Sequence, residues 1–313
     1  MTLAIETVDL IKKYNNFKAL DELNLEVGKG MIYGFLGPNG AGKTTTIKIL
    51  MGLLKADGGS AFLLGEDVES DGAKTRFNVG YMPELPSFPS HLSGPELLDI
   101  YGQLYGLSKS ERKRKAEELL ELVDLSQRKD GRIDTYSKGM QQRLGIAQSL
   151  IADPELLVLD EPTAGLDPEG RAEVRDIIRK IGDEGVTVFL SSHLLEEVQK
   201  ICSHVTIINH GTSVMSGSME EISKDFSGRS EVVVEVEKPK KGLISSLREL
   251  SGVVKVDREG RELTVVVEGE EDLRGEISRT IVREGGAILE MRTKKHSLED
   301  VFLKVTREEK SDE

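Results

Sequence analysis

The segment GPNGAGKTT, Gly37 to Thr45, constrains the fold of this chain more than any other feature of the sequence. It fits the pattern G-x-x-x-x-G-K-[ST], in which glycines let backbone amides turn inward around phosphates. The segment follows a strand-like run, MIYGFLG, and precedes a helical run, TTIKILMGLL, which is the context that the pattern requires. This context disfavours the alternative of a glycine-rich turn with an exposed lysine. The sequence therefore predicts an α/β fold with a phosphate-binding loop.

Within this loop, Lys43 is expected to reach the β- and γ-phosphates of a nucleotide, and the Thr44 hydroxyl to hold Mg²⁺. Backbone amides are expected to cradle the phosphates. The predicted nucleotide-binding residues of the loop are Gly37, Pro38, Asn39, Gly40, Ala41, Gly42, Lys43, Thr44 and Thr45.

A pair of acids, Asp160 and Glu161, follows the apolar run LLVL directly. Asp160 can sit beside Mg²⁺, and Glu161 can orient or deprotonate an attacking water. Helix N-termini also favour acidic residues, so this pair by itself is weak evidence. Its weight comes from its combination with the phosphate-binding loop.

Further polar residues follow other strand-like runs. Glu84 follows NVGYMP and His193 follows VTVFLSS. Ligands of open parallel sheets bind outside the carboxyl ends of the strands, so we expect these residues, the loop and the acid pair on one rim. A lone histidine is more often a residue at a helix start, but this placement favours hydrogen bonding of His193 to a γ-phosphate. The other histidines show no metal-ligand spacing: His91, His204, His210 and His296.

The composition limits the cellular compartment and the classes of partner that fit this chain. The formal net charge of −13 argues against broad electrostatic attachment to nucleic acid, so no nucleic-acid partner is expected. The basic run within Glu111–Glu118 is flanked by acids and is typical of a solvated helix face. Cys202 is the only cysteine, which fits a reducing cytosol. The N-terminal residues lack a signal-peptide layout, and no apolar run approaches the roughly 18 residues of a membrane span.

Two domains are predicted. Residues 1–222 alternate strand-like and helical runs, with βαβ order around LLVLD and VTVFLSSH. Apolar density falls near SMEEISKDFSGRS, which indicates a linker. Residues 230–306 carry a βαββαβ pattern, with a hairpin turn at Glu259 and Gly260, as in a split-βαβ, ferredoxin-like domain. A last helix is expected to begin at Ser297, and the charged tail 307–313 to fray.

The order of these motifs resembles the nucleotide-binding subunits of ATP-binding-cassette (ABC) transporters. The resemblance covers about residues 1–220 and rests on GPNGAGKTT, YSKGMQQR, LLVLDEPTAGLDP and SSH. It implies a P-loop NTPase cassette, with a mixed sheet, an antiparallel β subdomain and a helical subdomain. It also implies ATP and Mg²⁺ as ligands, and catalytic roles for Lys43, Glu161 and His193. Tyr14 would stack on adenine, the alternative being a structural tyrosine on a strand.

YSKGMQQ resembles the ABC signature, usually LSGGQ, whose helix points at the γ-phosphate held by the opposite subunit. Ser137 and Gly139 match it, whereas Lys138 and Met140 depart from it. By the same resemblance, Asp167 contacts the opposite subunit, and it can also be a helix N-cap. The partner is then a second copy of the chain or a paralogous cassette. The sequence alone leaves contact within one chain open.

Glu84 stands where many ABC proteins carry a glutamine that senses Mg²⁺ and touches the permease. YMPE, SKGM and the ending HSLEDVFLKVT resemble the ATPases of ABC-2-type exporters, the drug-resistance and sodium-extrusion relatives. The resemblance implies a cytoplasmic ATPase on the inner face of the cell membrane, held there by an integral-membrane permease. The alternatives are a soluble ABC-type ATPase with a non-membrane partner and a non-catalytic, ATP-binding regulator. Glu161 and His193 argue against the regulator.

Overall fold

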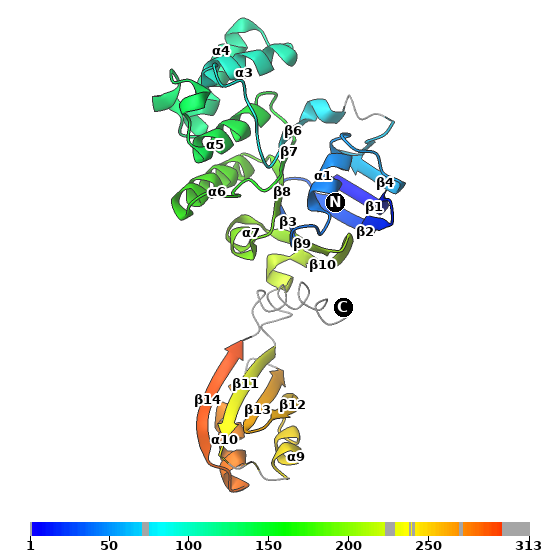
Figure 1. The fold of residues 1–313 in the computed structure, drawn as a ribbon, viewed down its shortest axis with the longest axis vertical. Coiled ribbons are helices and arrows are strands. Elements are labelled where there is room, and N and C mark those ends of the chain that lie inside the picture. The colour runs from blue at the N-terminus through cyan, green and yellow to red at the C-terminus, as the bar shows by residue number, and fades with distance from the viewer. Residues whose placement is uncertain are drawn as a thin grey trace. The chain divides into compact units, whose positions relative to one another are not determined.

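The structure, a computed structural model, describes residues 2–70, 75–222, 229–237, 239, 242–268 and 272–295. The chain divides into two compact units, Met1–Met219 and Glu220–Glu313 (Figure 1). Each unit has a sheet and a hydrophobic core of its own. Among the described residues, no helix is long and apolar enough to cross a bilayer.

The first unit contains a four-stranded antiparallel sheet with the order β2-β1-β4-β5. Its strands are β1 (Leu3–Tyr14), β2 (Phe17–Gly28), β4 (Gly58–Leu63) and β5 (Glu66–Asp67). Leu23, Leu25 and Val27 alternate with exposed residues along β2 and are buried. This sheet is the antiparallel β subdomain that the sequence predicts.

A second, six-stranded sheet of the same unit has the order β10-β9-β3-β8-β7-β6. All neighbouring strands are parallel except the edge pair β9 and β10. The strands are β3 (Ile32–Leu36), β6 (Val79–Met82), β7 (Leu156–Leu159), β8 (Thr187–Ser192), β9 (His204–Asn209) and β10 (Thr212–Ser218). Every residue of β7 and β8 is buried, as continuous apolar strands of a parallel sheet require.

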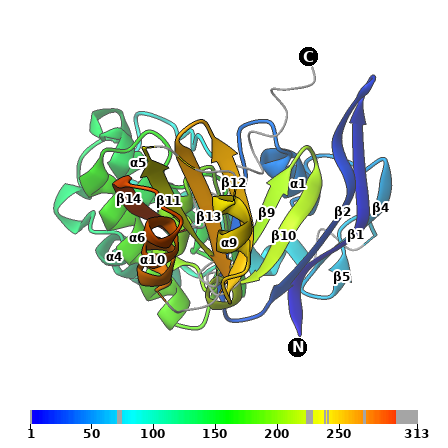
Figure 2. The ribbon, with the colours of Figure 1, turned by 90° about the horizontal axis from the view of Figure 1, so that it is seen from below.

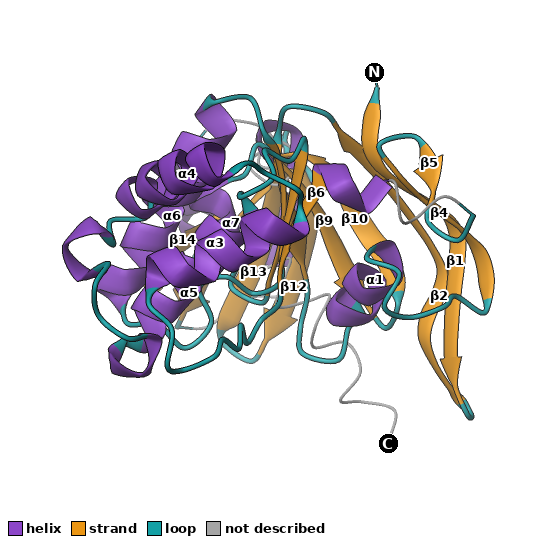
Figure 3. Ribbon diagram, turned by 90° about the horizontal axis from the view of Figure 1, so that it is seen from above, coloured by secondary structure: helices purple, strands orange, loops and turns teal. Residues whose placement is uncertain are grey.

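Helices surround this mixed sheet. Helix α1 (Lys43–Leu50) lies between the two sheets, where Ile47 and Leu50 join a core with Leu20 and Phe35 (Figure 2). The helices α3, α4 and α5 pack on one another as a helical subdomain (Figure 3). The remaining helices of the unit include α6 and α7. Their bounds are α3 (Gly94–Leu104), α4 (Lys109–Leu122), α5 (Lys138–Ser149), α6 (Pro168–Asp183) and α7 (Leu195–Ile201).

The second unit has the order β11 (Arg229–Val236), α9 (Leu243–Arg248), β12 (Val253–Glu259), β13 (Glu262–Glu268), α10 (Arg274–Arg283) and β14 (Ile288–Lys295). Its antiparallel sheet has the strand order β12-β13-β11-β14. Both helices pack on one face of it, with Leu247 and Ile277 against Val234 and Val265. The predicted ferredoxin-like βαββαβ fold is confirmed. The expected helix from Ser297 and the tail 307–313 lie outside the described residues.

The sequence does not predict the strands β4, β5 and β10. Strand β4 begins with Gly58 and Gly59, and β10 is TSVMSGS, so neither carries the apolar alternation that marks a strand. Both owe their extended form to a neighbour: β4 pairs with β1 and β10 with β9. Tertiary pairing overrides weak local propensity here.

We predict that a chain ending at Ser223 folds and binds ATP, because the core cluster that joins the two sheets of the first unit extends to Ile208 and the buried Ile222 is retained. The ATP dissociation constant of this shortened chain should lie within about threefold of that of the full chain, a difference under ~0.7 kcal/mol. Calorimetric titration of both proteins with ATP measures it. An insoluble or ATP-blind fragment would show that the two units do not fold independently.

Candidate nucleotide site

The glycine-rich loop joins β3 to α1 and is tied to the neighbouring strand. The Gly37 N–H donates to the Ser192 carbonyl at 3.1 Å. A β-carbon on Gly37 would lie 2.4 Å from the Ile208 carbonyl oxygen, so no other residue fits without movement of the backbone. Gly42, with φ of 111°, precedes the first turn of α1 in a conformation that favours glycine. The loop therefore presents the N-terminus of α1, which is suited to phosphate.

Lys43 is buried, and its ammonium is fully engaged. Its Nζ donates to the carbonyls of Gly37 at 2.7 Å and Pro38 at 3.1 Å. It also forms an ion pair with Glu161 Oε1 at 3.2 Å. These contacts place a positive charge at the mouth of the loop. An incoming phosphate group offers Lys43 a stronger set of anionic acceptors than the two carbonyls do.

Each carboxylate oxygen of Glu161 has its own partner. Oε1 contacts Lys43, and Oε2 lies 2.8 Å from His193 Nδ1. Because an ionised carboxylate only accepts hydrogen bonds, Nδ1 carries the hydrogen in this arrangement. The second ring nitrogen of His193 can then donate to a phosphate only if the ring is protonated, or if Nδ1 releases Glu161. The sequence does not anticipate this contact between His193 and Glu161.

Asp160 is 1% exposed and faces a different set of groups. Its Oδ1 accepts from the Ser191 hydroxyl at 2.7 Å and from the Thr44 hydroxyl at 3.5 Å. Burial raises the pKa of Asp160, these hydrogen bonds oppose the rise, and the negative charges of Glu161 and Glu84 add to it. This concentration of negative charge favours a bound cation.

The oxygens of Thr44 and Asp160 fit Mg²⁺, which prefers hard oxygen ligands. Within the described ranges, no three His, Cys, Asp or Glu side chains gather so as to hold a metal ion by themselves. That is the usual situation for Mg²⁺ in nucleotide sites, where one or two protein ligands act together with phosphates and water. The donor set therefore suits Mg²⁺ bound together with a nucleotide.

Tyr14 lies at the end of β1, with 47% of its surface exposed. The Lys12 ammonium lies 5.7 Å from the centroid of its ring. An exposed ring of this kind offers a face for stacking on a base. The structure places Tyr14 in the antiparallel sheet.

Ser137 and Asp167 are both helix N-caps. The Ser137 hydroxyl accepts from the Met140 N–H at 3.2 Å at the start of α5, and Asp167 accepts from the Gly170 N–H at 3.0 Å at the start of α6. Both residues and Gly139 line one cavity of about 540 Å³. The structure thus brings Ser137, Gly139 and Asp167 together in a cavity whose lining does not include the cluster around Lys43 and Glu161.

The exposed Glu84 follows β6, and its backbone is held by α5. The Gln142 side-chain amide donates to the Glu84 carbonyl at 3.2 Å. The Glu84 carboxylate lies close enough to Asp160 to raise its pKa. Two residues of the site, Gln142 and Ser191, are absent from the sequence-based expectations. The sequence could have indicated Ser191 as a hydroxyl residue at the end of an otherwise apolar, strand-like run.

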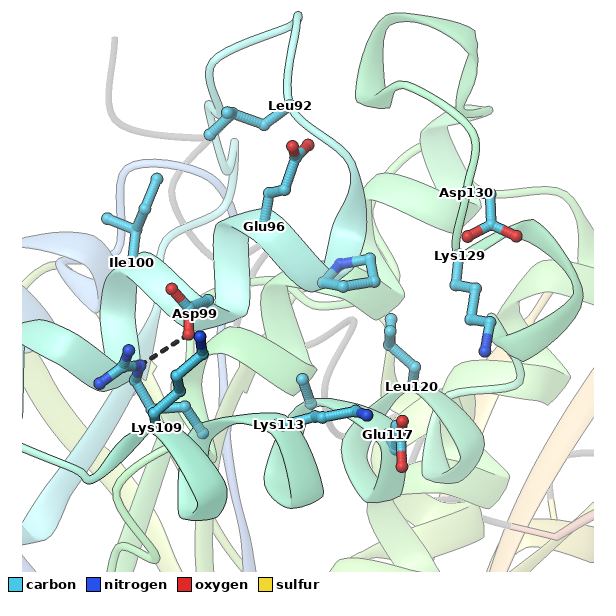
Figure 4. A pocket seen from close by; sticks show the side chains of 13 residues that line it. Leu92, Glu96, Asp99, Ile100, Lys109, Lys113, Glu117, Leu120, Lys129 and Asp130 are labelled. Carbon is cyan, nitrogen blue, oxygen red and sulfur yellow. Dashed lines mark hydrogen bonds and ion pairs between the residues drawn. The ribbon is translucent and has the colours of Figure 1, made fainter.

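A separate cavity, of about 700 Å³, opens between α3 and α4 in the helical subdomain (Figure 4). Its apolar lining includes Leu92, Ala116 and Leu120, and charged residues of both signs surround it. Arg112 and Asp99 form an ion pair at 2.6 Å on one wall. Its lining includes none of the predicted site residues.

Comparison with known proteins identifies the family of this chain. The family model of the ABC transporter matches residues 20–164, and that of the DrrA1-3-like C-terminal domain of ATP-binding proteins matches residues 217–306. The daunorubicin resistance ATP-binding protein DrrA3 of Streptomyces coeruleorubidus is 35% identical, over 96% of this chain and 94% of its own length. This chain belongs to the ABC transporter family.

Two further matches cover most of this ABC protein. The bacitracin transport ATP-binding protein BcrA of Bacillus licheniformis is 36% identical, over 97% of this chain and 98% of its own length. A solved ATP-binding subunit of an ABC transporter superposes with a TM-score of 0.64 at 30% identity, over 72% of this chain and 93% of that chain. The predicted cassette fold and the resemblance to exporter ATPases are confirmed. The protein is the ATP-binding and ATP-hydrolysing subunit of an ABC exporter, and the soluble alternative is not favoured.

We predict that Gly37→Ala lowers the melting temperature and weakens ATP binding at least tenfold, because the new methyl group collides with the Ile208 carbonyl. Forced backbone shifts of this kind cost about 1–3 kcal/mol. Gly30→Ala is the matched control: Gly30 has φ of 76° but no neighbour within 4 Å, so this variant should lose stability alone. Thermal melts and ATP titration of both variants separate the effects. Equal ATP affinity in the two variants would contradict the proposed fit at Gly37.

Proposed function

We propose that this ABC ATPase binds Mg²⁺ with ATP, closes as a dimer around two nucleotides and drives a separate membrane permease. The observation that carries the proposal is the cluster at the carboxyl ends of β3, β7 and β8. There Lys43, Thr44, Asp160, Glu161 and His193 converge on the mouth of the phosphate-binding loop.

The chemistry follows from the contacts. The loop amides and Lys43 hold the phosphate chain, and Thr44 and Asp160 hold Mg²⁺, which neutralises charge on the phosphates when it is bound. When Lys43 turns to the phosphates, Glu161 Oε1 loses its ammonium partner and becomes a free acceptor. Glu161 then orients or deprotonates the attacking water. His193 steadies Glu161 through Oε2. We assign to its second ring nitrogen a contact with the same water or the γ-phosphate, which it can donate to once the ring is protonated or Nδ1 has released Glu161.

The dimer gives a role to the cavity lined by Ser137, Gly139 and Asp167. The N-terminus of α5, with Ser137 and Gly139, is a site that favours an anion. We assign this anion to the γ-phosphate of an ATP held by the opposite subunit. Asp167, at the start of α6 in the same cavity, then lies at the subunit interface. Tyr14 stacks on the adenine of the nucleotide bound in its own subunit.

The permease is the partner that couples hydrolysis to transport. The relatives named for bacitracin transport and for daunorubicin resistance support this proposal, because their names are those of transport and resistance ATP-binding proteins. The chain would then lie at the cytoplasmic face of the membrane, attached through that permease. Glu84 would contact both the nucleotide side and the permease.

We predict that Glu161→Gln keeps ATP affinity but lowers the hydrolysis rate by roughly 10²-fold or more, the contribution expected of a general base. The neutral amide keeps the shape of the side chain. ATP should then hold the variant as a dimer on a sizing column. Normal turnover by Glu161→Gln would remove this residue from the mechanism.

A second prediction tests which chain supplies the signature helix. Lys43→Ala damages the site of its own chain, and Ser137→Arg damages the site of the opposite chain if α5 acts across the interface. Each homodimer then loses both sites. A mixed dimer combines both damaged parts in one site and leaves the other intact. Mixing the two inactive proteins should therefore restore ATP binding at one site.

Fluorescently labelled chains show whether mixed dimers form, and Glu161→Gln added to both chains slows their separation. If the signature helix acts within its own chain, both sites of a mixed dimer stay damaged. Mixed dimers that form without regaining ATP binding would contradict the arrangement across the interface.

A further inference from the structure

Ser191 joins the two carboxylates of the site. It is fully buried and follows Leu190 of β8, which pairs with Leu159 of β7. Asp160 follows Leu159, so Ser191 in β8 and Asp160 just after β7 lie at the same level of two paired parallel strands. The side chain of Ser191 therefore continues the contact between the strands just beyond their last pair.

One hydroxyl group serves both acids. It donates to Asp160 Oδ1 at 2.7 Å and accepts from the Glu161 N–H at 2.9 Å. A serine hydroxyl has a single hydrogen, which is thereby committed to Asp160. Both contacts are buried, so loss of the hydroxyl would leave a buried acceptor and a buried donor without this partner.

The contact to Glu161 also fixes an unusual backbone. Glu161 has φ of 49°, in the left-handed region that residues other than glycine seldom adopt. Such a conformation persists only where the surroundings hold it. In this conformation the two acids contact different groups: Glu161 faces Lys43 and His193, and Asp160 faces Thr44.

We propose that Ser191 is a positioning residue for ATP hydrolysis, whose hydroxyl sets the metal-side carboxylate of Asp160 and the water-side carboxylate of Glu161 in one geometry. The inference rests on the roles proposed above for these two acids. Ser191 acts through these two acids rather than on the substrate itself. Its effect is transmitted through both neighbours at once, so its removal disturbs metal binding and catalysis together.

The experiment compares Ser191→Ala with Ser191→Thr, which keeps a hydroxyl, in the full-length protein. Ser149→Ala is the matched control, because Ser149 is also buried and its hydroxyl donates to one backbone carbonyl, Ile146, far along α5. The measurements are the hydrolysis rate, the Mg²⁺ concentration for half-maximal rate and the affinity for a fluorescent ATP analogue with and without Mg²⁺. Thermal melts report stability.

For Ser191→Ala we expect kcat to fall by roughly 10–100-fold, in line with small misplacements of catalytic groups. The half-saturating Mg²⁺ concentration should rise, and the gain in analogue affinity that Mg²⁺ gives to the wild type should shrink. Analogue affinity without Mg²⁺ should stay within about threefold, under ~0.7 kcal/mol, because the loop is untouched. Ser191→Thr should recover most of kcat. Ser149→Ala should change only the melting temperature.

An unchanged kcat and Mg²⁺ dependence in Ser191→Ala would overturn the proposal. So would a parallel loss of analogue affinity without Mg²⁺, which indicates general damage to the fold. If Ser191→Ala is unfolded, Ser191→Cys replaces it, because a thiol is of similar size but a weak donor. Failure of both to fold would assign the hydroxyl to folding and also count against the proposal.

Failure of the proposed function gives a different result. If wild-type hydrolysis needs neither Mg²⁺ nor Glu161, the roles of both acids are wrong. If it needs both and Ser191→Ala behaves as the wild type, only the positioning role is wrong.

Discussion

The parallel pairing of β8 with both β3 and β7 is the constraint on which the site depends. Leu36 of β3 pairs with Ser192, and Leu159 of β7 pairs with Leu190. This register brings the start of the phosphate-binding loop, the acid pair and His193 to the same end of the sheet. A slip of one residue would turn each side chain to the opposite face of its strand. Both faces of β7 and β8 are buried, so a slip would also replace the closely packed side chains on each face.

The charge balance between the buried side chains of Lys43 and Glu161 links ATP binding to catalysis. A buried ion pair is strongly destabilised when one partner leaves and nothing replaces it. Lys43 and Glu161 neutralise each other, and the phosphates of ATP give Lys43 a new partner at the moment when Glu161 is needed as an acceptor. Glu161 is not left alone by this exchange, since His193 still holds its second oxygen. The same contacts can therefore keep the protein folded before ATP binds and release the base afterwards.

Much of the fold is readable from the sequence, and the reasons are local. LLVL and VTVFL are mainly apolar runs, which are typical of strands buried on both faces, and GPNGAGKTT carries the glycines that its loop conformation requires. Strand β10 could not be read, because TSVMSGS becomes a strand only beside β9. The contact of Ser191 with Asp160 was equally hidden: the two residues are 31 positions apart, and only the register of β7 and β8 makes them neighbours.

The two N-caps Ser137 and Asp167, which line one cavity, show how one residue can serve both stability and the proposed interface. Ser137 caps α5 with a lone pair of its hydroxyl oxygen, so the hydroxyl hydrogen is not used by the cap. Aspartate would cap the helix equally well, yet it would bring a negative charge toward a phosphate. A serine can cap α5 and still donate to an anion in front of it. Asp167, by contrast, suits a position that faces donors, since its second oxygen only accepts. The choice of cap thus follows from the charge of the group expected on the opposite side.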